Sequence, residues 1–102
     1  MSRRLFLVFL DPGPGWLPGL TSRQQPDWDR HATFMEDLFA RGRIVLGGPY
    51  ADFSRVLVIV NAGDADEARG YFDKDPWNEA GILRPAEIVE WKALLDSREQ
   101  GD

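Results

Sequence analysis

The sequence contains no cysteine. This absence excludes disulfide frameworks, thiolate metal sites, thiol nucleophiles and thiol redox chemistry. Histidine is nearly absent as well, because His31 is the only one in the chain. A zinc site would have to combine that single imidazole with carboxylates, which is an unusual ligand set for zinc. We therefore expect no bound metal ion, and we predict no other cofactor.

Long apolar runs and an excess of positive charge are also lacking. The 12 basic and 17 acidic residues give a net charge of −5, and no basic patch is interleaved with aromatic residues, which argues against nucleic-acid binding. The longest apolar run, Leu5 to Leu10, is far shorter than the about 20 residues that cross a membrane. It is also followed by no small-residue cleavage site of the kind found in signal peptides. We therefore expect a cytoplasmic protein that binds neither nucleic acid nor membrane.

The length of the chain and its hydrophobic pattern predict a single domain of strands and helices. The chain has 102 residues, a typical length for one domain with its own core. We place this domain at residues 1–95 and interpret residues 96–102 as a frayed tail, because that stretch is charged and has no hydrophobic pattern. The pattern of apolar, polar and turn-forming residues predicts a strand at 4–10, a helix at 26–41, strands at 43–46 and 55–61, a helix from 64 and a strand at 86–92.

Two segments are rich in turn-forming residues. Residues 11–27 hold three glycines and four prolines, so we expect no regular element there. Such a long connection is unusual in a compact domain, and its apolar residues Trp16, Leu17 and Leu20 indicate that it packs beside a cleft or across a partner subunit. Residues 75–81 are interpreted as a short turn-rich segment.

The predicted order, βαββαβ, is that of the split βαβ or ferredoxin-like fold. Such an α+β domain places two helices on one face of a four-stranded antiparallel sheet. The predicted strands are apolar on both faces, so the uncovered face would be a large exposed apolar patch. We expect a homodimer, packed sheet against sheet, to bury that face.

His31 falls on the apolar stripe of the helix predicted at 26–41, whereas Glu36 is expected to face outward. The inward stripe, at helical spacing, is Trp28, His31, Met35, Leu38 and Phe39. A buried imidazole needs hydrogen-bond partners, which Asp52 in LGGPYAD or Asp75 in DKDPW could supply. Paired with a carboxylate, the imidazole would suit general acid–base catalysis. Alternatively, His31 is a core residue bonded to a backbone carbonyl.

Several loop residues could belong to a site or serve only the fold. Asp52 could be a turn residue that bonds nearby backbone, and Asp75 could simply end a helix before Pro76. Gly47 and Gly48 could bring backbone amides close to a ligand, or form a bulge or a dimer contact. Aromatic side chains could wall a pocket for an aromatic substrate, or pack in the core and at an interface. The candidates for contact with a substrate are Trp16, Trp28, Gly48, Pro49, Tyr50 and Trp77.

The chain resembles the YCII-related family. The likeness rests on HATFMEDLFARGRIVLGGPYAD, the apolar strand after it and EARGYFDKDPWNEAGILRPAEIVEW, which together cover residues 31–91. These stretches match the family pattern of a His on the first helix, a GGP or GP hairpin, a DP dipeptide after the second helix and a closing strand that ends near Trp. Residues 11–25 depart from the pattern, because the family has only a short link there.

The resemblance implies a dimeric α/β barrel with a cleft between sheet and helices. It also implies a His–Asp pair, with His31 as the base, Asp75 as its first-choice partner and Asp52 as the second choice. One type of family member is a dehydrochlorinase of chlorinated hydroquinones, and related barrels include muconolactone isomerases and cofactor-free monooxygenases. We therefore expect a small cyclic or aromatic ligand. Our hypotheses are a cofactor-free lyase or isomerase, a non-catalytic ligand-binding or partner module, and a cofactor-free monooxygenase.

Overall fold

A computed structural model describes residues 4–98 of the chain. Its elements are β1 (Arg4–Pro12), the 3-10 helix η1 (Ser22–Gln24), α1 (Trp28–Ala40), β2 (Ile44–Pro49), β3 (Val56–Ala62), α2 (Ala65–Gly70), α3 (Pro76–Glu79) and β4 (Leu83–Trp91). The four strands and the two longer helices confirm the predicted βαββαβ order. Within this part of the chain, no helix is long and apolar enough to cross a membrane.

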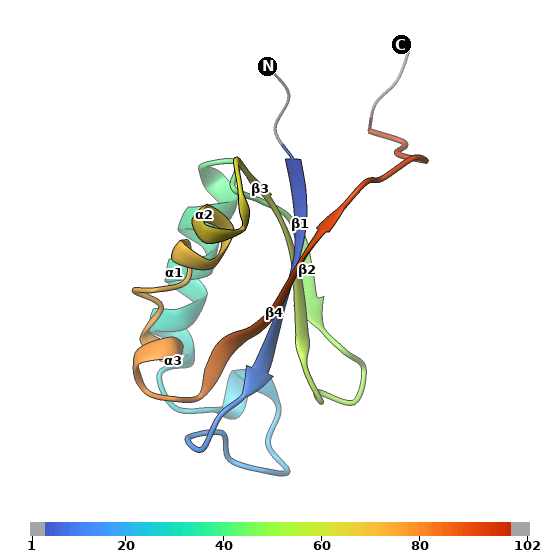
Figure 1. The fold of residues 1–102 in the computed structure, drawn as a ribbon. Helices are drawn as coiled ribbons and strands as arrows, with labels where there is room; N and C mark the ends of the chain where they lie inside the picture. Colours follow the sequence, from blue (N-terminus) through green and yellow to red (C-terminus); the bar gives the residue numbers. More distant parts are fainter. Residues whose placement is uncertain (1–3, 99–102) are drawn as a thin grey trace.

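The strands form one antiparallel sheet in the order β2-β3-β1-β4. The two central strands, β1 and β3, pair from Arg4 opposite Ala62 to Leu10 opposite Val56. The helices α1, α2 and α3 all lie on the same side of this sheet (Figure 1). This arrangement confirms the predicted ferredoxin-like α+β fold.

The core lies between the helices and one face of the sheet. Alternate residues of β1 and β3 are buried, because every second side chain of a strand points to the same face. The helical layer closes the core with side chains that are at most 4% exposed, namely Leu38, Ala68, Phe72 and Trp77. The helices therefore pack against one face of the sheet only.

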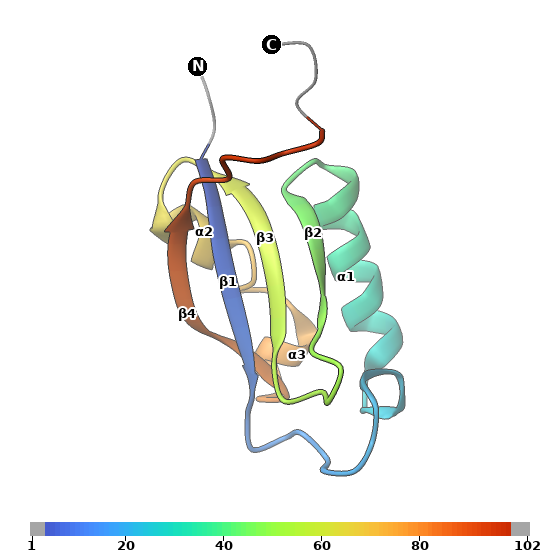
Figure 2. The same ribbon diagram turned by 90° about the vertical axis from the view of Figure 1, so that its right-hand side faces the viewer.

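The opposite face of the sheet is apolar, and the helices do not cover it (Figure 2). At its centre, Leu7 of β1 has Ile59 and Val89 opposite it on the neighbouring strands. Large side chains are exposed toward its edges, among them Leu46 at 65% and Trp91 at 43%. We call this surface the open sheet face.

The segment 11–27 is ordered and contains η1, so the prediction that it holds no regular element is wrong. The side chain of Gln25 is buried, and it bonds both the N–H and the carbonyl of Leu17, at 2.8 and 2.9 Å. Gly13 lies so close to Gly81 that a Cβ atom there would overlap the Gly81 carbonyl oxygen. The Gln25 bonds hold the segment together, and hydrogen bonds from Gly13 and Gly15 to the carbonyls of Ile82 and Gly81 fasten it to the chain that follows α3.

The segment 75–81 contains a one-turn helix, α3, which we had not predicted. Asp75 is its N-cap and accepts the Trp77 N–H at 3.0 Å, while Pro76 fits the first helical position because no N–H is needed there. Three helices therefore cover the sheet, in place of the two that we predicted. A second correction concerns α1, where Phe39 was expected to face inward and is 61% exposed.

The predicted tail at 96–102 lies partly outside the described residues, which end at Arg98. Hydrogen bonds from Arg98 lower the pKa of the Asp96 carboxyl to about 2. Just before this pair, Leu94 and Leu95 are 90% and 98% exposed. Leu95 lines a hollow together with Leu5, Ile59 and Trp91, so this end of the chain adds apolar surface beside the open sheet face.

Candidate functional site

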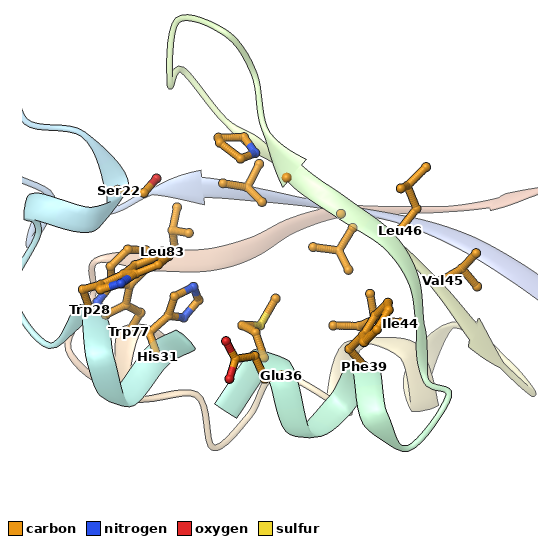
Figure 3. A pocket seen from close by; sticks show the side chains of 16 residues that line it. Ser22, Trp28, His31, Glu36, Phe39, Ile44, Val45, Leu46, Trp77 and Leu83 are labelled. Atoms are coloured by element: carbon orange, nitrogen blue, oxygen red, sulfur yellow. The ribbon is translucent and has the colours of Figure 1, made fainter. Parts of the chain in front are cut away.

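A pocket of about 430 Å³ lies between α1 and the strands β2 and β3 (Figure 3). Its walls are almost entirely apolar and include Trp28, Met35, Ile44, Val58, Trp77 and Leu83. Among its lining residues, only His31 and Glu36 carry ionisable side chains. A concave apolar cavity of this size with few polar groups is typical of small-molecule sites.

His31 projects from α1 into this pocket. The Nδ1 side of its ring is hydrogen-bonded to Asp75. Its Nδ1 lies 2.9 Å from Oδ1 and 3.0 Å from Oδ2 of the Asp75 carboxylate. Both residues are buried, with exposed fractions of 7% and 2%. Because an ionised carboxylate can only accept hydrogen bonds, we assign the ring proton to Nδ1. This tautomer leaves Nε2 with a free lone pair.

The Nε2 atom of His31 is accessible from the pocket. Among residues 4–98, no side chain or backbone group forms a hydrogen bond with it. In the same part of the chain, no fully buried side-chain nitrogen or oxygen lacks a hydrogen-bond partner. Nε2 is therefore not fully buried, and Figure 3 shows the ring pointing into the pocket that it lines.

Asp75 serves the fold and the imidazole at the same time. Its Oδ1 accepts the Trp77 N–H at the start of α3 and also lies within hydrogen-bond distance of the His31 ring. A buried carboxylate is costly in free energy unless such partners satisfy it. The position of His31 is therefore tied to the formation of α3.

Two tryptophans contact the imidazole, and a third packs against one of them. The Trp77 indole stacks on the His31 ring, with centroids 3.9 Å apart and planes inclined by 5°, and its Nε1 donates to the Pro26 carbonyl at 2.6 Å. Trp28 packs against both rings, at 5.8 Å from His31 and 5.7 Å from Trp77. Trp16 stands edge-on to Trp77 at 6.0 Å. These contacts fix the plane of the imidazole.

The structure brings together most, but not all, of the predicted site residues. His31, Trp28, Gly48, Pro49 and Trp77 line the pocket, and Asp75 and Trp16 lie behind it. Within the described chain, Tyr50 and Asp52 are exposed in the β2–β3 turn and do not line the pocket. Hydrogen bonds from Ser54 lower the pKa of the Asp52 carboxyl, which therefore stabilises its own turn. The carboxylate that contacts the imidazole is that of Asp75, not Asp52.

Two features of the pocket differ from what the sequence predicts. Glu36 was expected only to face outward, yet its exposed side chain also lines the pocket. The strand β2 runs straight through Gly47 and Gly48, and its register shift falls between Ile44 and Leu46 instead of at the glycines. The glycines therefore belong to a regular strand that forms one wall of the pocket.

Comparison with known families places this arrangement in context. The model of the YCII-related domain family matches residues 5–92, which span the sheet, the three helices and the pocket. No curated protein matches the chain. Within residues 4–98, no group of three or more His, Asp and Glu side chains is arranged to hold a metal ion.

Proposed function

This chain belongs to the YCII-related family, and we propose that it binds a small cyclic or aromatic molecule beside His31 and acts on it as a cofactor-free lyase or isomerase. One observation carries the proposal: an imidazole held by a buried carboxylate presents its second nitrogen to an apolar pocket. Buried His–Asp pairs in clefts are a common arrangement for proton transfer.

In the proposed reaction, Nε2 of His31 removes a proton from a C–H or O–H group of the bound ligand. The electron pair of the broken bond stays on the ligand, and the new N–H proton makes the ring an imidazolium. Asp75 stabilises this cation at 2.9 Å, and the stacked Trp77 keeps the ring in place. An isomerase returns the proton to another atom, whereas a lyase expels a leaving group from the neighbouring carbon.

Replacing His31 with asparagine tests the proton-transfer role. The Asn amide nitrogen lies near the position of Nδ1 and can still donate to Asp75, but nothing replaces Nε2. We expect His31→Asn to fold normally and to lose proton transfer by at least about a hundredfold. The measurement is deuterium exchange of the α-protons of tetralone, a bicyclic ketone, in D₂O by NMR. Equal exchange rates in the variant and the parent protein would refute the catalytic role.

The apolar character of the pocket also favours a second function, a non-catalytic ligand-binding module. Burial of a small apolar molecule needs no base, since hydrophobic contact alone supplies much of the affinity. In this case the parent protein would bind tetralone without accelerating its exchange, and His31→Asn would leave the affinity nearly unchanged. For the third possibility, a cofactor-free monooxygenase, oxygen uptake with a hydroquinone is the distinguishing measurement.

We propose that a second copy of this chain covers the open sheet face. The face is apolar across all four strands, and a flat surface of this kind can pair with itself about a two-fold axis. Toward one end of it, Arg55 pairs with Asp11 and Glu87 and stacks over Phe9. An apolar centre with a charged rim is the usual anatomy of a protein interface.

Placing a charge at the centre of the open sheet face tests this dimer. Leu7 lies between Ile59 and Val89, so Leu7→Lys would bury an unpaired ammonium in a sheet-to-sheet interface. We expect the parent protein to be a dimer and Leu7→Lys to be a monomer with an unchanged circular dichroism spectrum. Sedimentation equilibrium distinguishes them, and Thr33→Lys on the exposed side of α1 is the control. A monomeric parent protein would rule the dimer out.

A further inference from the structure

The pocket has no cationic side chain of its own. None of its lining residues is a lysine or an arginine, and Glu36 is its only acidic one. The Glu36 side chain is exposed, and within residues 4–98 no basic group pairs with it. Figure 3 shows its carboxylate on the side of the pocket that holds His31. A ligand that enters therefore meets an uncompensated negative charge.

His31 does not reverse this charge balance. When the imidazole is protonated, the Asp75 carboxylate at 2.9 Å cancels its charge, and when it is neutral the pair is negative. In neither state does the pair contribute net positive charge. Together with Glu36, it leaves the pocket negative in both protonation states.

One cationic side chain contacts a residue that lines the pocket, but it belongs to a separate hollow. The Arg23 guanidinium stacks over the Trp28 ring at 5.5 Å. It lines a separate hollow that also contains Arg30, Asp27 and Asp29, so that two carboxylates balance two guanidinium groups there. The net charge of the chain, −5, also disfavours anions at long range.

We infer that the pocket selects uncharged ligands, and that the negative charge of Glu36 lowers its affinity for anions. This inference rests on the proposed binding of a small molecule in the same pocket. The ligand class is an apolar molecule without carboxylate, sulfonate or phosphate groups, carrying a single polar or weakly acidic group for Nε2. Proton transfer to His31 is compatible with this selection, because the ligand anion then forms beside the imidazolium created in the same step.

A matched pair of probes tests the inference. Naphthol and the corresponding naphthoate have the same ring system, but only naphthoate is charged near neutral pH. By isothermal titration calorimetry, we expect the parent protein to bind naphthol at least about tenfold more tightly than naphthoate. Glu36→Gln keeps the shape of the side chain and removes its charge. It should raise naphthoate affinity by about three- to tenfold at low salt and leave naphthol affinity within about twofold.

Asp37→Asn is the matched control, because it removes the same charge from the next residue of α1. Asp37 is exposed, pairs with Arg41 at 2.8 Å and does not line the pocket. This variant should leave both affinities unchanged. Equal binding of naphthol and naphthoate by the parent protein would overturn the inference while leaving the proposed function standing. Unchanged naphthoate affinity in Glu36→Gln would overturn the role of Glu36. Binding of neither probe would refute the proposed function and the inference with it.

Discussion

Replacing Trp77 with alanine is expected to lower the free energy of unfolding by about 3–5 kcal/mol. The side chain is 1% exposed, so its removal leaves a large cavity between α3 and the sheet. The variant also loses the stacked contact with His31 and the hydrogen bond from Nε1 to the Pro26 carbonyl. A loss of this size is a large part of the about 5–15 kcal/mol that stabilises a typical domain.

Urea unfolding followed by circular dichroism measures this loss, since fluorescence would be distorted by removal of an indole. Trp77→Phe keeps a ring against His31 but not the Nε1 hydrogen bond, so it should lose about 1–2 kcal/mol. Phe39→Ala is the contrasting variant. Phe39 lines the same pocket as Trp77, but its side chain is 61% exposed. It should change stability by less than about 1 kcal/mol. If Trp77→Ala unfolds at the urea concentration of the parent protein, Trp77 is not a core residue.

The sheet was predictable from the sequence because its two central strands are short continuous apolar runs. These runs are Leu5–Leu10 in β1 and Val56–Val60 in β3, and each is followed directly by a polar residue. The small helices gave no such signal. α3 depends on a cap and a proline, and η1 on a hydrogen bond between Thr21 and Gln24, so neither contains enough residues to show helical periodicity.

The candidate site was predictable only in part. His31 could be recognised as a polar residue on an apolar stripe, and Asp75 as the residue before a proline that ends the preceding turn. Glu36 could not be placed, because the helical pattern separates inward from outward residues and does not reveal where a helix stands away from the sheet. The pocket lies where α1 and β2 leave such a gap, which is a property of tertiary packing.

Replacing Asp75 with alanine should destabilise the protein by about 3–5 kcal/mol, because it removes one member of a buried pair and an N-cap together. The Trp77 N–H would lose its acceptor and the His31 Nδ1–H would be left buried without a partner. Asp75→Asn separates the two roles, since its amide oxygen can still accept from Trp77. We expect Asp75→Asn to lower the free energy of unfolding by less than half as much as Asp75→Ala does, as measured by urea unfolding.

The same Asp75→Asn variant should nevertheless be inactive, because of the tautomer it imposes on His31. The Asn amide group would donate to Nδ1, so that Nδ1 becomes an acceptor and the ring proton moves to Nε2. Nε2 then faces the pocket as a donor and cannot take a proton from a ligand. We expect tetralone exchange to fall by at least about a hundredfold while the fold is kept. A folded Asp75→Asn protein with the exchange rate of the parent would show that the carboxylate serves only as the cap of α3.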